Sequence, residues 1–412
     1  MSAIKKFYRS HNIAVFLFCS LCLYSVFIGE GKIEKIGDYA LSFHAVDFSM
    51  GFASKILVGQ IYNLFFDVVT QRNVMFLEIL FLVAFFVAVS FILEAFIKKC
   101  NPENRKNIFI PITLLLIGPF TFSLITKVIG MLDTYWLFLC ALFFVFLSRK
   151  KLYFFIIPLI IVTIMIHFAT VFNYAPFYII IMLYKISCCD NKRERNYLWI
   201  ITVVAAVAAV ALALYFMIFE QSNMVYTYEE FKDFMSSRGI TDTLYYDYAF
   251  YRAPEANASD YEELIQYQNI SGNAAKDLIS LITIQVKLAL DSIYFGNDIL
   301  PFVLLSPIIY FVYYFRFIIF KQNKENKVKR FSLFCMSVLF FMTYFVGKIT
   351  SYDNLRWIIH SYIPLILSLL YILYIEKEKT IAVFSGIIER IPKKILATYI
   401  LIYGIVVLEP YM

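Results

Sequence analysis

Long apolar runs, separated by short polar segments, extend from one end of the chain to the other. Several are longer than the roughly 18 apolar residues that mark a membrane-spanning helix. The sequence therefore predicts an all-α polytopic membrane protein, with residues 1–412 forming a single integral membrane domain. We expect about eleven transmembrane helices, at roughly 13–29, 74–97, 108–125, 131–147, 152–166, 169–186, 197–219, 299–320, 331–347, 357–375 and 395–408.

The composition agrees with this pattern and excludes several classes of protein. Hydrophobic residues make up 61% of the 412 positions and charged residues 16%, whereas soluble domains carry about 25% charged residues. A soluble enzyme, a disordered chain and a secreted disulfide scaffold are therefore excluded. The sequence has no P-loop, GxGxxG, HExxH or GxSxG signature, so we expect no cofactor. The scattered carboxylates favour no metal site.

Lysine and arginine concentrate in alternate connections between the spans. With a cytoplasmic N-terminus, the inner connections hold most of these cations, among them Lys98, Lys99, Lys150, Lys192 and Lys324, and the outer ones hold most of the acidic residues. The positive-inside rule therefore favours this orientation. The richness in Ile, Phe, Tyr, Lys and Asn suggests an AT-rich bacterial genome, so we expect a bacterial cytoplasmic (inner) membrane. The net charge of +7 comes from the cations of the inner connections, which an anionic inner leaflet attracts. It indicates no nucleic-acid partner.

Two outer segments are predicted to contain amphipathic helices. Residues 30–73 form the first outer loop, in which Phe48 to Phe66 has one largely apolar face and is expected to lie flat in the membrane interface. Residues 220–298 form a large outer loop that ends in a second such helix, Leu278 to Phe295. The polar part of this loop, about 220–277, carries eight tyrosines. Their rings suit stacking on sugars or, alternatively, packing at the interfacial belt.

Ionisable side chains are costly at membrane depth, so those at the ends of spans are functional candidates. The offsets of three and four residues between Asp353, Arg356 and His360 put these three on one helical face. The predicted topology places a whole set at the outer mouth of the protein: Asp38, His44, Asp47, Lys55, Lys127, Asp133, His167, Asp353, Arg356 and His360.

Each candidate also has a structural interpretation. Asp353 with Arg356, and Lys127 with Asp133, could form ion pairs at helix ends. His167 could hydrogen-bond a carbonyl in a tight hairpin, and Asp47 could cap a helix. A functional role is favoured because all of these residues are predicted at the same depth, at the outer mouth of the protein.

Cations, carboxylates and histidines beside interfacial helices suit a lipid-phosphate-linked substrate. Arginine or lysine would hold a pyrophosphate. A carboxylate or histidine would accept the proton of an attacking sugar hydroxyl. The interfacial helices would shape a lateral opening for a polyprenyl tail.

At these residues the chain resembles a known group of proteins. The first outer loop with Asp47, the segment GFASKILVG at 51–59, His167 in a hairpin, the large outer loop and DNLRWIIH at 353–360 are similar to bacterial polysaccharide polymerases of the Wzy/EpsG type. They are also similar to lipid-dependent glycosyltransferases of the GT-C class. The resemblance extends over the whole chain at the level of its architecture.

The resemblance implies roles for individual residues. It implies catalysis by Asp47, or alternatively Asp38, and by His360 and His167. It implies that Arg356 holds phosphates, and the residues expected to bind substrate with it, from their place at the outer mouth, are Asp353, Lys127, Asp133 and Lys55. Related chains carry an arginine where Lys55 stands, and lysine keeps the charge but loses the bidentate fork.

The expected function is a polymerase that joins undecaprenyl-pyrophosphate-linked oligosaccharide repeat units, for capsule, O-antigen or exopolysaccharide, on the outer face of the membrane. Its partners would be the polyprenyl-pyrophosphate-linked oligosaccharide, the lipid bilayer and other membrane proteins of polysaccharide assembly. The alternatives are a flippase or transporter of the same lipid-linked sugars, a membrane O-acyltransferase, and a purely structural subunit.

Overall fold

The computed structural model describes residues 7, 10–27, 36–101, 105, 130–219, 224–243, 246–247, 295–350, 354–376 and 378–405. Within these ranges the regular elements are helices and no strand occurs, which confirms the predicted all-α class. The α-helices are α2 (Asn12–Phe27), α3 (Asp38–Ala45), α4 (Ile56–Tyr62), α5 (Gln71–Lys99), α8 (Asp133–Leu147), α9 (Ile156–Ile166), α10 (Tyr174–Ser187), α11 (Lys192–Phe219), α12 (Tyr228–Ser237), α16 (Phe295–Gln322), α17 (Lys327–Thr350), α18 (Asn354–Ile375), α19 (Glu378–Glu389) and α20 (Lys393–Ile405), with 3-10 turns η1 (Phe48–Met50), η3 (Lys150–Phe155) and η4 (Phe168–Phe172).

Three of the described helical segments are long and apolar enough to cross a membrane, namely Gln71–Lys99, Lys192–Phe216 and Trp357–Ile375. This is consistent with a membrane protein. The predicted spans 74–97 and 131–147 fall on α5 and α8, whereas 152–166 and 169–186 begin in the 3-10 turns η3 and η4. The predicted span at 108–125 lies outside the described residues. The total of about eleven spans stays a prediction.

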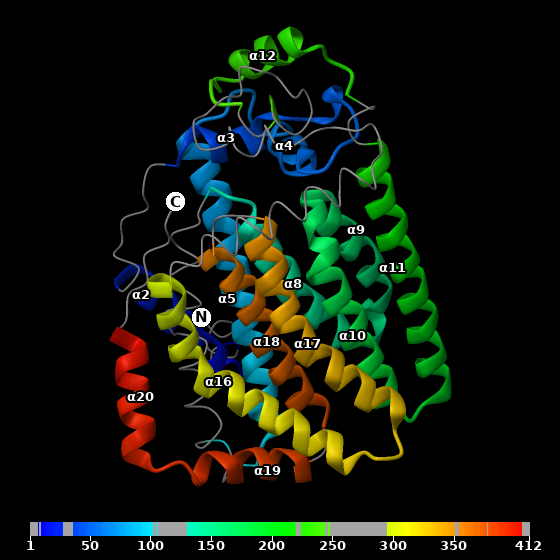
Figure 1. The fold of residues 1–412 in the computed structure, drawn as a ribbon, viewed down its shortest axis with the longest axis vertical. Helices are drawn as coiled ribbons and strands as arrows, with labels where there is room; N and C mark the ends of the chain where they lie inside the picture. Colours follow the sequence, from blue (N-terminus) through cyan, green and yellow to red (C-terminus); the bar gives the residue numbers. More distant parts are fainter. Residues whose placement is uncertain are drawn as a thin grey trace.

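Helix α18 lies at the centre of the bundle and packs against α5, α8, α10 and α17 (Figure 1). Its apolar segment is 89% buried, whereas the segments of α5 and α11 are 39% and 33% buried. The outward faces of α5 and α11 expose large apolar side chains such as Leu80 and Val207. Such faces suit contact with lipid, so α18 is the helix best placed to carry a buried site.

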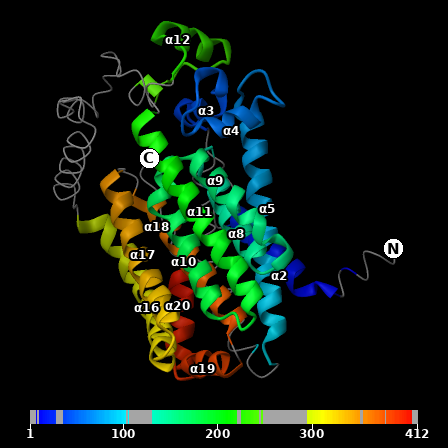
Figure 2. The same cartoon turned by 90° about the vertical axis from the view of Figure 1, so that its right-hand side faces the viewer.

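The helices α3, η1, α4 and α12 form a cap at one end of the bundle, opposite α19 (Figure 2). The backbone N–H of Val225 donates to the carbonyl of Met50 (2.8 Å), and that of Val69 donates to the carbonyl of Arg238 (3.0 Å). The two predicted outer loops are therefore joined in the cap. The α10–α11 and α16–α17 connections, which carry predicted inner cations, lie at the α19 end.

A capping box starts α12. The Thr227 side chain accepts from the backbone N–H of Glu230, and the Glu230 carboxylate accepts from the backbone N–H of Thr227. These hydrogen bonds from Thr227 lower the pKa of Glu230. The helix is thus fixed at the start of its first turn.

The single amphipathic helix predicted from Phe48 to Phe66 is wrong. Gly51 (φ 124°) and Lys55 (φ 66°) take positive φ values, which helices do not tolerate, so the segment breaks into η1 and α4. Helix α4 is buried at Ile56, Val58, Gly59 and Tyr62, and its place in the membrane interface stays a prediction. Residues 38–45 form α3, a helix that the sequence pattern did not predict.

The second predicted interfacial helix, 278–295, lies outside the described residues except at its last position, where α16 begins. Most of the tyrosine-rich loop also lies outside them.

The close approach of α4 to the segment after α3 gives a stability prediction. A methyl group at Gly59 would overlap the carbonyl oxygen of Val46, whereas one at Gly386 in α19 meets nothing within 4 Å. We expect Gly59→Ala to destabilise the protein by about 1–3 kcal/mol through overpacking. Gly386→Ala should stabilise by about 0.5–1 kcal/mol. Thermal unfolding in detergent measures both, and equal midpoints for the two variants would contradict the packing of the cap.

The separation of the cap from the basic connections gives a topology prediction. In a background without reactive cysteines, Ser237→Cys at the end of α12 should react with a membrane-impermeant maleimide in intact cells. Gln322→Cys at the end of α16 should react only after permeabilisation, because the basic connections are expected to be cytoplasmic. The reverse labelling pattern would invert the predicted orientation.

Candidate functional site

The strongest candidate site centres on His360, which is 2% exposed. Its Nε2 bonds to the Oδ1 of Asp133, which is 1% exposed, and its Nδ1 lies 2.7 Å from the Tyr174 hydroxyl. An ionised carboxylate can only accept, so His360 donates through Nε2 and accepts at Nδ1 from Tyr174. We call Asp133, His360 and Tyr174 the buried triad.

The triad assembles where three helices begin. Asp133 is the first residue of α8, where the helix dipole favours a negative charge. Tyr174 is the first residue of α10, and its backbone N–H donates to the side chain of the N-cap residue Asn173 (2.6 Å). His360 lies in the second turn of α18. Pro364 follows four residues later and has no N–H for the His360 carbonyl.

Aromatic rings enclose His360. The Trp136 ring lies 5.0 Å from the His360 ring and 5.4 Å from that of His167, and Trp357 lies 5.8 Å from His360. The structure therefore brings together three predicted residues: Asp133, His167 and His360. The His167 backbone carbonyl also accepts from the Thr170 hydroxyl (2.8 Å), whereas the expected bond from the His167 side chain to a carbonyl stays a prediction.

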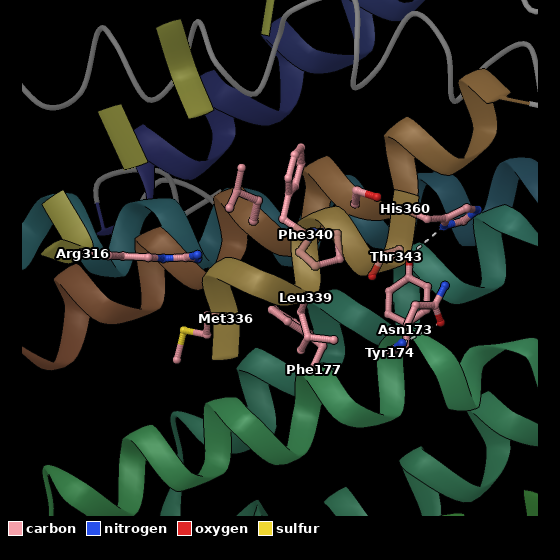
Figure 3. Close-up of a pocket in the computed structure, with 12 residues that line it drawn as sticks. Asn173, Tyr174, Phe177, Arg316, Met336, Leu339, Phe340, Thr343 and His360 are labelled. Carbon is pink, nitrogen blue, oxygen red and sulfur yellow. Dashed lines mark hydrogen bonds between the residues drawn. The ribbon is translucent and has the colours of Figure 1, made fainter. Parts of the chain in front are cut away.

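A pocket of about 310 Å³, including its open part, lies beside the triad (Figure 3). Most of its wall is apolar, and the lining residues are Asn173, Tyr174, Phe177, Arg316, Met336, Leu339, Phe340, Thr343, His360, Ser361, Pro364 and Leu365. Among the described residues, Asn173 Nδ2 and Trp136 Nε1 are buried donors without a hydrogen-bond partner. Both lie next to the triad, and Asn173 also lines the pocket, where its amide can donate to the oxygens of a ligand.

A second buried polar group adjoins the triad through α8. Glu78 of α5 accepts from the Thr134 hydroxyl and lies 3.7 Å from His44 Nε2, which in turn is 3.0 Å from the Tyr135 hydroxyl. Glu78 and His44 are fully buried. The sequence prediction missed Glu78, although a carboxylate inside the predicted span 74–97 is itself a signal of function. It missed Asn173 and Tyr174 because neither is ionisable at neutral pH.

Asp47 has a different environment, in the cap. Its carboxylate accepts from the Ser49 backbone N–H (2.9 Å) at the N-cap of η1, from Asn63 (3.2 Å) and from Arg238 (3.0 Å). The side chains of Asp47 and Arg238 are 14% and 19% exposed. These contacts match the helix-cap interpretation, and they tie the two predicted outer loops together.

The other predicted residues lie as follows. Lys55 is buried with its Nζ 4.9 Å from the centre of the Phe43 ring, in the cap. Arg356 is in α18 four residues before His360, and its side chain is not described. Asp353 and Lys127 lie outside the described residues.

Metal ligands do not gather in the described part of the chain, where no three His, Cys, Asp or Glu side chains come together as a possible site. The chain matches no protein-family model, no curated protein and no solved structure. The fold and the site therefore define only a class: an all-helical protein with helices long enough to cross a membrane and a buried Asp–His–Tyr group beside an apolar pocket.

Variants of Asp47 can distinguish a capping role of this residue from a catalytic one. Serine is a good N-cap residue but has no carboxylate for Arg238, so we expect Asp47→Ser to lose some stability and to retain function. Asp47→Ala should lose about 0.5–2 kcal/mol of stability with the cap. Thermal unfolding measures stability, and complementation of a deletion strain measures function. A stable Asp47→Ser protein without function would instead make Asp47 a reacting group.

Proposed function

We propose that the chain is a bacterial membrane glycosyltransferase that polymerises undecaprenyl-pyrophosphate-linked oligosaccharide repeat units. The observation that carries the proposal is the buried triad at the wall of a pocket, with His360 Nδ1 2.7 Å from the Tyr174 hydroxyl. A histidine oriented by a buried carboxylate is suited to remove a proton from a hydroxyl group.

In the proposed reaction, a hydroxyl of the acceptor sugar takes the place of the Tyr174 hydroxyl at His360 Nδ1. The proton passes to Nδ1, and Asp133 stabilises the resulting imidazolium. The acceptor oxygen forms a bond to the anomeric carbon of the donor sugar. The bond between that carbon and the pyrophosphate oxygen breaks, and the lipid pyrophosphate leaves with the electron pair.

Groups around the triad support the binding of such a substrate. Asn173 lines the pocket, and its Nδ2 is available to donate to sugar oxygens. The backbone places Arg356 about 6 Å nearer the start of α18 than His360, at a rise of about 1.5 Å per residue. From there, Arg356 is proposed to hold a phosphate, which guanidinium groups bind bidentately.

A membrane O-acyltransferase is the second candidate, favoured by the mostly apolar wall of the pocket. An acyl chain needs such a wall, and the same histidine would deprotonate the accepting sugar hydroxyl. A flippase or transporter for lipid-linked sugars remains the third alternative.

The test compares surface polysaccharide from host cells that carry wild type, His360→Ala, Asp133→Asn or the control His11→Ala. His11 lies away from the triad, at an ion pair with Glu94 (2.7 Å). We expect loss of the long-chain ladder on gels for the two triad variants, with single repeat units retained and protein levels unchanged. Rates of chain extension in membranes should fall about 100- to 10,000-fold, as for loss of a general base.

Other outcomes would favour other functions. Loss of even single surface-exposed units would indicate transport. An unchanged ladder with loss of O-acyl groups would indicate acyl transfer. An unchanged ladder in both triad variants would exclude the triad as the polymerising site.

A further inference from the structure

Arg316 of α16 is a buried cation whose charge is not balanced within the described residues. It is 2% exposed, and its Nη2 donates to the Ser368 hydroxyl (2.7 Å). Its Nε and Nη1 are buried and make no hydrogen bond, and no ion pair in the described part of the chain includes it. A guanidinium stays protonated, and a buried charge without a counter-charge is strongly destabilising.

The guanidinium lies in the wall of the pocket described above, at the end opposite His360 (Figure 3). Ser368, its hydrogen-bond partner, follows His360 by eight residues on α18, about 12 Å along the axis. Between the two ends the wall is apolar, with Phe177, Leu339 and Phe340 among its residues. One cationic end and a long apolar wall are complementary to an amphiphile with an anionic head.

We propose that this pocket binds a single-chain amphiphile, with a carboxylate or phosphate monoester at Arg316 and its chain along the apolar wall toward His360. The oxygens of the head accept from Nε and Nη1 and supply the missing counter-charge. The 310 Å³ of empty space includes the open part of the pocket, so the amphiphile's chain would lie along the wall as in a groove and would not be enclosed.

The position of Arg316 indicates where the head enters. Arg316 precedes the end of α16 at Gln322 by six residues, about 9 Å along the helix. The basic α16–α17 connection follows directly, with Lys321, Lys324 and Lys327. These cations attract an anion to the α19 end of the bundle. The proposal does not depend on the transfer reaction at His360.

The test measures thermal unfolding of the purified full-length protein in a maltoside detergent. The probes are dodecyl phosphate, dodecanoate, uncharged dodecanol and inorganic phosphate alone. We expect dodecyl phosphate or dodecanoate to raise the midpoint, and dodecanol to leave it unchanged. Arg316→Met should weaken the binding of these anions at least tenfold, and Arg316→Lys should weaken it less. The control Lys232→Met removes an exposed cation from α12 in the cap and should bind as wild type does.

The ligand-free proteins give a second readout. Because Arg316 lacks a counter-charge, Arg316→Met should raise the unfolding midpoint of the empty protein while abolishing the shift with anions. A lower midpoint together with an unchanged dodecyl phosphate shift would make Arg316 a structural residue and overturn the proposal. An equal shift with inorganic phosphate alone would overturn the amphiphile and leave a free-anion site. An equal shift with dodecanol would overturn the role of the charge.

Discussion

The hydrogen bond between Asp133 and His360 is the interaction on which the rest of the site depends. It joins the start of α8 to the second turn of α18, two helices separated by more than half of the chain. In a buried setting a carboxylate needs a partner, and the imidazole supplies a donor. The bond also fixes which nitrogen of His360 carries the proton, so the other one faces Tyr174. A single hydrogen bond therefore orients the His360 imidazole, holds the two helices together and satisfies a buried carboxylate.

The polar groups of the bundle fall into layers. The triad lies where α8, α10 and α18 begin, and Glu78 with His44 lies beside it because Thr134 and Tyr135 follow Asp133 on α8. Arg316 lies deeper, at the level of Ser368. Between these layers the pocket is apolar. A ligand that spans it therefore meets a proton acceptor at one end and a permanent positive charge at the other.

The sequence predicted the all-α class and the positions of described helices such as α5 and α8, because apolar runs of this length report burial directly. It also placed Asp133, His167 and His360 at one level, since topology fixes depth. It did not predict which of them touch, because contacts between distant helices depend on rotation about their axes. It also failed for the stretch from Phe48 to Phe66, whose helical periodicity hides the backbone breaks at Gly51 and Lys55.

The ion pair between Asp47 and Arg238 links two segments that are far apart in the sequence. Each partner is mostly buried, so replacing only one segment would leave a charge uncompensated in the cap. The two segments therefore depend on each other. A recombination between related chains that transfers only one of them would leave the cap less stable, whereas transfer of both would keep it stable.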